Sequence, residues 1–288
     1  MPRVALATYE RAPALAPDDR PLIPALAAHS VAAAPVVWND PGARWGEFDG
    51  VIIRSCWDYH LRPAHFREWL GMVAALGVPV WNPVPLIGWN ADKRYLLDLA
   101  ARGVPTLPTC VAPRDSGADA IESLAAARGW QQIVVKPAVS ASGYETHALG
   151  LPFDDSAQRI VRGVAQLGDM LVQPFAPEVP RDGELSLVFL DGTFSHGARK
   201  RARAGEFRVQ VEHGGSIDAT QIDPRVVQQA VRALAMLPSA PLYARVDGIV
   251  RGDAFLLMEL ELIEPNLFLG LQPGAYDVLA CAIASRLA

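Results

Sequence analysis

YARVDGIVRGDAFLLMELELIEPN, residues 243–266, is the stretch that decides the fold. Two apolar runs flank a short Arg-Gly-Asp turn at residues 251–253, which is the pattern of a β-hairpin. Carboxylates interrupt these runs at Asp247, Glu259 and Glu261, where a buried strand normally carries valine or leucine. Glu259 and Glu261 are two residues apart and share one face of a strand. With Asp247 across the hairpin, the sequence predicts a cluster of acids.

Three acids on one face repel each other unless a cation lies among them. Mg²⁺ prefers oxygen ligands of this kind and usually keeps substrate phosphates in its remaining positions. The alternative is a solvated strand face, but the leucine, methionine and isoleucine residues around the acids argue against full solvation. We therefore predict a Mg²⁺ site made by Asp247, Glu259 and Glu261.

Composition narrows the class of protein. The 288 residues, 51% hydrophobic and 20% charged, are enough for two globular domains or one domain with a lid. The net charge of -5 argues against a general nucleic-acid binder, which needs a basic surface. Three scattered cysteines fit a reducing cytoplasm, and no apolar run suits a signal peptide or membrane span. We expect a cytoplasmic protein without nucleic-acid or membrane partners, and a homodimer is left open.

The chain divides into three parts by its pattern of elements. Strands and helices alternate over residues 1–88, which indicates a parallel sheet covered on both faces. Residues 89–176 read as a small α+β unit, with a helix at 92–102 and strands at 106–111, 133–136, 145–149 and 170–174. Long strands at 184–190 and 194–201 and the acidic hairpin dominate residues 177–288. The predicted fold class is an N-terminal parallel α/β domain followed by two α+β units.

A loop of small residues follows a buried strand in IVVKPAVSASGYET, residues 133–146. Lys136 ends that strand, where a lysine is costly unless it meets an anion. Ser140, Ser142 and Gly143 let backbone N–H groups approach phosphate oxygens closely. Neither a Walker motif nor a GxGxxG dinucleotide motif is present. The stretch predicts a phosphate loop; the alternative is a flexible loop after an edge strand.

Three further segments carry polar groups that a nucleotide site needs. Gln173, Pro174 and Phe175 end a predicted strand, and backbone freed from the ladder can bond an adenine edge. Glu184 suits a ribose or a substrate amine, or else it is a surface strand residue. Lys200 and Arg208 bring positive charge, although basic residues at strand ends are often only solubilising.

The order of these motifs resembles the ATP-grasp superfamily of carboxylate ligases. The resemblance rests on Lys93 in WNADKR, Lys136 with its loop, QPF at 173–175, GEFR at 205–208, and ARVD and MELE in the hairpin. It covers about residues 89–270, and the preceding region fits the pre-grasp domain. The most similar subgroup contains glutathione synthetase and the ribosomal-protein glutamate ligases, in which a GEFR segment also precedes Gly-Gly, here residues 214–215.

The resemblance implies an ATP-grasp fold, with ATP and Mg²⁺ as cofactors. Loop 139–146 would close over the triphosphate and residues 173–176 would receive adenine. The implied nucleotide-binding residues are Lys93, Lys136, Ser140, Ser142, Gly143, Gln173, Pro174, Phe175 and Glu184. Lys93 and Lys136 would hold phosphates.

The same resemblance implies the metal and catalytic residues. Asp247, Glu259 and the residue at 261 would ligate Mg²⁺, but the family usually has Asn where this chain has Glu261. A second acid-x-Asn pair, Glu264 and Asn266, lies farther along the chain and is an alternative register. Arg245 would face the acyl-phosphate or the tetrahedral oxyanion, and the predicted catalytic set is completed by Lys200 and Arg208.

A candidate substrate site follows the apolar strand at residues 51–53. Ligands bind at the carboxyl ends of parallel strands, and there Arg54 and Asp58 could hold an amino-acid head group through charge-assisted bonds. The alternative is a structural Arg–Asp pair. Asn266 is predicted to join this site. Together RSxWDY, WNxDKRYL and ELSLVF resemble the D-cycloserine ligases, which cyclise O-ureido-D-serine with ATP.

These observations predict an ATP-dependent, ADP-forming ligase for a small amino-acid-like substrate. The γ-phosphoryl group would activate a carboxylate or carbonyl oxygen, and an amine of the same or another molecule would attack the acyl-phosphate. Catalysis of this kind rests on positioning and electrostatics, so it needs no nucleophilic serine or cysteine. Two alternatives stay open: a nucleotide-binding regulatory module without turnover, and a phosphotransferase that releases a phosphorylated product.

Overall fold

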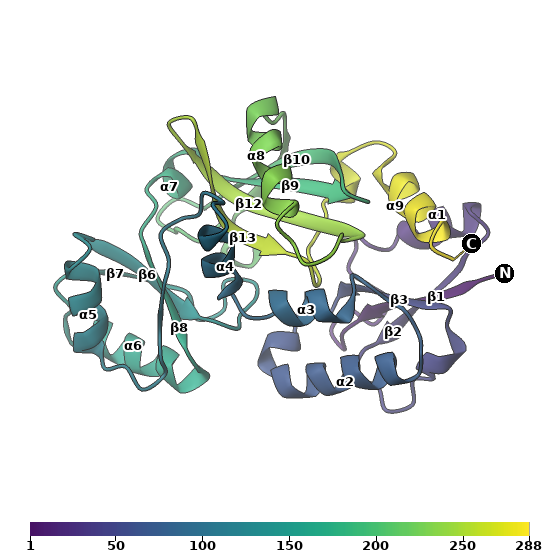
Figure 1. Ribbon diagram of the computed structural model, residues 1–288, viewed down its shortest axis with the longest axis horizontal. Coiled ribbons are helices and arrows are strands. Elements are labelled where there is room, and N and C mark those ends of the chain that lie inside the picture. The colour runs from purple at the N-terminus through teal and green to yellow at the C-terminus, as the bar shows by residue number, and fades with distance from the viewer. Residues whose placement is uncertain (288) are drawn as a thin grey trace.

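Three sheets, each built by its own part of the chain, organise the molecule (Figure 1). The computed structural model describes residues 1–287; residue 288, the last of the third predicted unit, lies outside the described residues. The predicted boundaries after residues 88 and 176 stay predictions. No helix among the described residues is long and apolar enough to cross a membrane.

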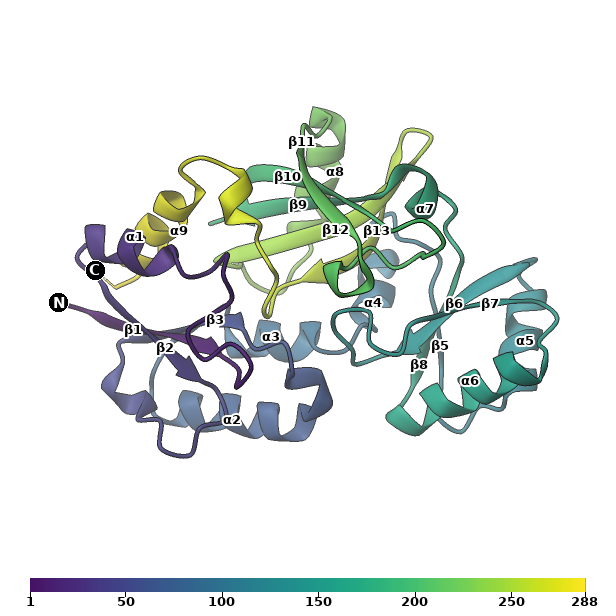
Figure 2. The ribbon, with the colours of Figure 1, turned by 180° about the vertical axis from the view of Figure 1, so that it is seen from behind.

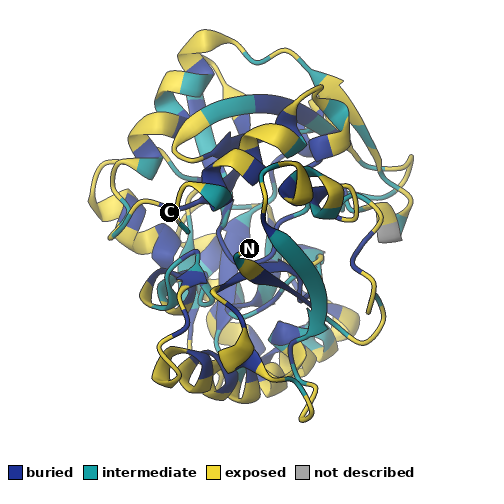
Figure 3. Cartoon of the chain, turned by 90° about the vertical axis from the view of Figure 1, so that its right-hand side faces the viewer, coloured by how far each residue is buried: buried dark blue, intermediate teal, exposed yellow. Residues whose placement is uncertain are grey.

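The N-terminal sheet is parallel and has the strand order β2-β1-β3-β4. Its elements are β1 (Arg3–Thr8), α1 (Leu22–Ala28), β2 (Ala32–Val37), β3 (Gly50–Ser55), α2 (Pro63–Ala75) and β4 (Val80–Trp81). Alternate residues of β1 face opposite sides: Val4 and Leu6 pack with α1 and with α9 (Ala275–Ala284), whereas Ala5 and Ala7 pack with α2. This burial on both faces confirms the predicted parallel sheet. Within this sheet, only the edge strand β2 has intermediate burial along its whole length (Figure 3).

The small sheet is antiparallel and has the order β5-β8-β6-β7. It consists of β5 (Cys110–Ala112), α5 (Ala118–Ala126), β6 (Gln132–Pro137), β7 (His147–Gly150), α6 (Asp155–Leu167) and β8 (Met170–Pro174). Both helices share one apolar cluster with the strands, through residues such as Ile121, Val161 and Val135. Asp154 caps α6 by accepting a hydrogen bond from the Ala157 N–H at 2.8 Å.

The large sheet is antiparallel and has the order β11-β10-β9-β12-β13; Figure 2 shows it from the β11 side. It contains α7 (Glu178–Asp182), β9 (Glu184–Leu190), β10 (Thr193–Arg201), β11 (Ser216–Thr220), α8 (Pro224–Leu234), β12 (Tyr243–Arg251) and β13 (Ala254–Glu261). The predicted hairpin is confirmed, because Asp247 pairs with Glu259 and Arg245 with Glu261 across it. Helix α8 packs on this sheet with α4 (Tyr95–Ala101) and with Leu86 of α3 (Val84–Asn90).

Some elements differ from the sequence-based expectation. The strand expected at 106–111 is reduced to β5 and an isolated bridge at Thr106, because Pro105 and Pro108 lack the N–H that a ladder needs. The helix expected at 92–102 begins only at Tyr95. Three short elements, α3, α7 and β11, were not predicted; α3 runs across the boundary expected between residues 88 and 89.

Candidate active site

A cavity of about 400 Å³ lies where the three sheets meet. Such a volume is within the range of small-molecule sites. The predicted residues that line it are Lys93, Lys136, Ser140, Ser142, Gly143, Gln173, Pro174, Phe175, Glu184, Lys200, Arg208, Arg245, Glu259, Glu261 and Asn266. Trp57 and Tyr59, which the sequence-based site did not include, also line it, as does Glu264, which the sequence offered only in the alternative metal register. The structure therefore brings residues from all three predicted units to one place.

Two lysines define one end of the cavity. The Lys93 ammonium lies 3.0 Å from a Glu259 oxygen and also donates to the Ser140 carbonyl in the predicted phosphate loop. Lys136, near the end of β6, has no ion pair with any described residue, and burial lowers the pKa of its ammonium group. An unpaired, half-buried cation beside a loop of small residues is suited to an anion.

The loop beside Lys136 is shaped to approach a ligand closely. Gly143 has φ +67°, and a side chain there would meet Gln210. Ser140 is buried and its hydroxyl donates to the Pro137 carbonyl at 3.1 Å. Arg208 already holds Glu206 at 2.8 Å, and this guanidinium lowers the pKa of Glu206 to about 2.

The predicted adenine segment follows β8. Gln173 donates to the Thr109 hydroxyl at 2.8 Å, and the Phe175 ring lies 6.1 Å from that of Phe207. The Phe175 N–H still donates to the Gln132 carbonyl, so the backbone leaves the ladder one residue later than we expected. The prediction that this segment receives adenine stays a prediction.

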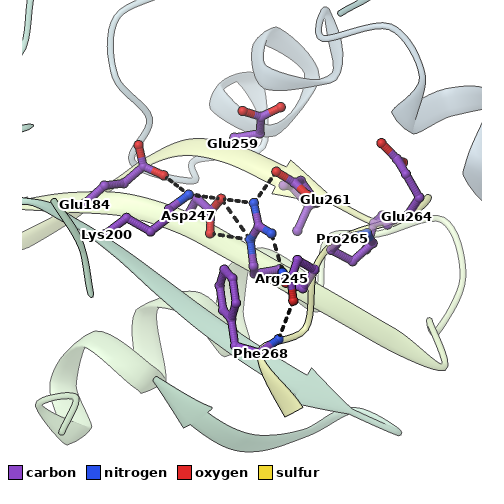
Figure 4. A network of polar contacts seen from close by, with 12 residues as sticks. Glu184, Lys200, Arg245, Asp247, Glu259, Glu261, Glu264, Pro265 and Phe268 are labelled. Carbon is purple, nitrogen blue, oxygen red and sulfur yellow. Dashed lines mark hydrogen bonds and ion pairs between the residues drawn. The ribbon is translucent and has the colours of Figure 1, made fainter. Parts of the chain in front are cut away.

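A buried network of charges connects four neighbouring strands of the large sheet, β10, β9, β12 and β13 (Figure 4). Asp247 is 1% exposed and accepts from the Arg245 guanidinium at 2.8–3.1 Å and from Lys200 at 2.8 Å. Lys200 also lies 2.5 Å from Glu184, and Arg245 also pairs with Glu261. These two cations hold the pKa of Asp247 far below its usual value despite burial.

This network contains Asp247, one of the predicted metal ligands. No group of three His, Cys, Asp or Glu residues within 1–287 lies close enough together to hold a metal ion. Asp247 is held by Arg245 and Lys200 and is not among the residues that line the cavity, and its assignment as a metal ligand stays a prediction. Glu259 and Glu261 line the cavity and fit a hard cation such as Mg²⁺ by their donor chemistry.

Two of the carboxyl groups that face the cavity have raised pKa values, because burial and neighbouring acids disfavour their charged forms. Burial together with Asp247 and Glu259 raises the pKa of Glu261 to about 7. Burial, with Glu261 nearby, raises the pKa of Glu264 to about 8. A surplus of buried acid of this kind favours binding of a cation. In the sequence, the signal for a functional role of Glu264 is an acidic residue next to apolar ones in ELELIEP, residues 259–265.

Arg54 and Asp58 are not among the residues that line the cavity, and their assignment as a substrate pair stays a prediction. Arg54 is fully buried, lies 2.9 Å from Asp19 and donates to the Pro265 carbonyl at 2.9 Å. Asp58 instead accepts from the Trp38 indole at 2.8 Å. The alternative of a structural role for Arg54 is the one the geometry supports, with Asp19 as its partner.

Comparison with known proteins identifies the family. Residues 4–82 match the family model for the D-cycloserine synthetase DcsG N-terminal domain. The cycloserine biosynthesis protein DcsG of Streptomyces lavendulae is 32% identical, with 94% of each chain covered. The chain belongs to the DcsG family of ATP-grasp ligases. The crystal structure of D-cycloserine synthetase DcsG superposes with a TM-score of 0.91 at 30% identity, over 99% of this chain and 100% of that one.

A more distant structure shows how widely the DcsG-like fold is shared. D-alanine–D-alanine ligase from Bacillus anthracis complexed with ATP matches with a TM-score of 0.71 at 15% identity, over 100% of this chain and 97% of that one. The ATP-grasp fold predicted from the motifs is thereby confirmed. Membership in a ligase family also confirms the predicted enzyme class, and it disfavours the regulatory module without turnover.

Proposed function

We propose that this ligase binds Mg²⁺·ATP in the cavity and closes the ring of an O-substituted D-serine, as its similarity to DcsG suggests. The observation that carries the proposal is the cavity itself, where the unpaired Lys136 and the phosphate-loop candidate face a strand of acids. Glu259 and Glu261 would hold Mg²⁺, which when bound offsets phosphate charge.

The residues of this chain have separable tasks in that reaction. Lys93 and Lys136 bind and orient the phosphates as a substrate carboxylate oxygen attacks the γ-phosphorus and ADP leaves. Arg245, held between Asp247 and Glu261, places a fixed positive charge on the cavity wall where oxyanion charge develops at the acyl carbon. The attacking nitrogen loses a proton, and phosphate leaves with the closing of the ring.

O-ureido-D-serine is the proposed substrate. Closing the ring between its aminooxy nitrogen and the activated carboxyl group gives D-cycloserine once the carbamoyl group is lost. With one ATP and one water consumed, the products balance as D-cycloserine, carbon dioxide, ammonia, ADP and phosphate. This places the enzyme in antibiotic biosynthesis.

A product assay tests the proposal. ADP release is measured with O-ureido-D-serine, its L-enantiomer, D- and L-serine and D- and L-alanine, and products are identified by mass spectrometry. We expect Mg²⁺-dependent ADP release with O-ureido-D-serine and formation of the cyclic product. ADP release with another amino acid would reassign the substrate. A stable phosphorylated product without ring closure would instead support the phosphotransferase alternative.

A further inference from the structure

One carboxylate in the cavity has no cationic partner. Glu184 and Asp247 pair with Lys200, Glu259 pairs with Lys93, and Glu261 pairs with Arg245. Glu264 also lines the cavity but forms no ion pair with any residue of the described chain, 1–287, and in Figure 4 no dashed line joins it to the network around Arg245. It is therefore the acid of this group that the described residues leave without an ion pair, with the Lys93 ammonium as a more distant positive charge.

Two hydrogen bonds hold the backbone at Glu264 and at the residue that follows it. The Trp57 indole donates to the Glu264 carbonyl at 3.0 Å, and Arg54 donates to the Pro265 carbonyl at 2.9 Å. Arg54 is part of β3 and Trp57 follows that strand, and Trp57 itself lines the cavity. Glu264 is 8% exposed, so its side chain at the cavity wall has little access to bulk water.

Leaving a carboxylate unpaired at a buried site is costly, and here the cost shows as a raised pKa. Such a group persists where a ligand supplies the missing charge. The cavity contains the opposite case as well, because Lys136 forms no ion pair with any residue in the described part of the chain, although Glu259 is near enough to favour its charge. One unpaired cation and one unpaired acid suit a phosphate donor together with a substrate that carries an ammonium group.

We propose that Glu264 binds the α-ammonium group of the substrate and so selects amino acids over acids that lack the amine. This inference rests on the proposed function, since it takes the substrate to be an amino acid. An ammonium group has three N–H donors and fits a carboxylate whose backbone is already fixed. Glu264 is then a specificity-determining residue, distinct from the Mg²⁺ ligands that we assign to Glu259 and Glu261.

Calorimetric titration of the full-length protein tests this role without requiring turnover. The protein is saturated with Mg²⁺ and a non-hydrolysable ATP analogue. Two probes are compared: O-ureido-D-serine and 3-(ureidooxy)propanoate, which is the same molecule with hydrogen in place of the amine. We expect the wild type to bind the amine-bearing probe about tenfold to hundredfold more tightly, the range of a charge-assisted bond.

Substitution then assigns that preference to one residue. Glu264→Gln keeps the shape but removes the charge, so the two probes should bind it equally. Glu264→Asp should keep part of the preference, and Glu68→Gln, at an exposed position on α2, should keep all of it. Affinity for the ATP analogue should stay the same in all three variants.

Four outcomes would overturn the inference. The first is equal affinity of the wild type for both probes, and the second is no measurable affinity for either probe. Both are measured on the wild type, so they do not depend on how the variants fold. A Glu264→Gln protein that keeps the preference but needs more Mg²⁺ to bind nucleotide would make Glu264 a metal ligand. Amine-dependent binding without any cyclic product would refute the proposed reaction alone, whereas turnover indifferent to Glu264 would refute the inference alone.

Discussion

The cavity lies between the large sheet and two other parts of the molecule, the N-terminal domain and the small sheet, which form its two walls. Different kinds of contact join these two walls to the large sheet. On the N-terminal side, the Asn82 side chain donates to the Tyr243 and Leu262 carbonyls at 2.9 and 2.7 Å, and the Tyr243 hydroxyl donates to the Ile53 carbonyl at 2.6 Å. All of these groups are buried. This wall is a continuous extension of the large unit, so changes in it should act first on stability.

The wall formed by the small sheet is attached by fewer buried groups. Lys93 contacts its loop backbone, and the ion pair between Arg94 and Asp169 is partly exposed. A single bridge joins Thr106 to Leu257 on β13. We therefore expect changes in this wall to alter ligand binding more than stability. The difference suggests a fixed substrate side and a more adaptable nucleotide side.

The largest effect is expected from breaking the fixed wall at Arg54. Arg54→Ala leaves Asp19 buried without its partner, which should lower the free energy of unfolding by about 3–5 kcal/mol. Urea unfolding of the purified variant measures this. Arg44→Ala is the control, because its pair with Glu47 is exposed and should contribute less than about 1 kcal/mol. A stable Arg54→Ala protein with weakened substrate binding would restore the original substrate hypothesis.

Lys136 and Arg54 differ in how much of their surroundings the sequence reveals. The strand pattern around Lys136 already places it next to a loop of small residues, so local sequence contains the whole argument. The partner of Arg54 is Asp19, 35 residues away in a loop whose path no local pattern reveals. The parallel sheet, the hairpin and its register were predictable because alternation and turn residues determine them.

Asp247 marks a second limit of sequence reasoning. Its pairing with Glu259 across the hairpin was predicted and is confirmed. Its contact with Lys200 was not, because that side chain extends from β10 across the intervening strand β9. The register places the small Ser186 of β9 opposite Asp247, which leaves room for this reach. The order of strands in a sheet is a tertiary property that the motifs do not encode.

Glu259, on the strand between the two walls, gives the next largest expected effect. Glu259→Gln removes one of the two fitting Mg²⁺ ligands, so turnover should fall about hundredfold, or about 2.7 kcal/mol. Raising Mg²⁺ should restore part of the rate. The rate of ADP release across a Mg²⁺ titration measures both effects. A variant whose rate matches the wild type at every Mg²⁺ concentration would exclude Glu259 as a ligand.

Substitution of Lys136 tests the wall formed by the small sheet. Lys136→Ala removes a cation that has no partner within the described chain, so the fold should be unaffected while ATP affinity falls roughly tenfold to hundredfold, or about 1.5–3 kcal/mol. Calorimetry with the non-hydrolysable analogue gives the affinity, and a thermal melt gives the stability. Unchanged ATP affinity in a folded protein would contradict the phosphate role. A large loss of stability would contradict the difference between the walls.

The smallest effect is expected where the two walls touch, at the ring contact between His60 and Tyr144, whose centroids are 5.2 Å apart. Burial and the nearby Lys93 lower the pKa of His60 to about 4, from about 6.5 in an unfolded chain. The unfolded state then binds the proton first as pH falls. The neutral His60 therefore contributes stability above pH 6.5, and this contribution is lost between about pH 6.5 and 4.

We expect that loss to amount to about 1–2 kcal/mol once the partial exposure of His60 is allowed for. His60→Phe keeps a ring against Tyr144 but cannot take up a proton, so its stability should fall less over the same pH interval. Urea unfolding at pH 7.5, 6 and 4.5 gives the two profiles, and their difference isolates His60 from the acids that titrate in both proteins. Parallel profiles would show that folding leaves the pKa of His60 unshifted, so that the contact between the walls does not disfavour its protonation.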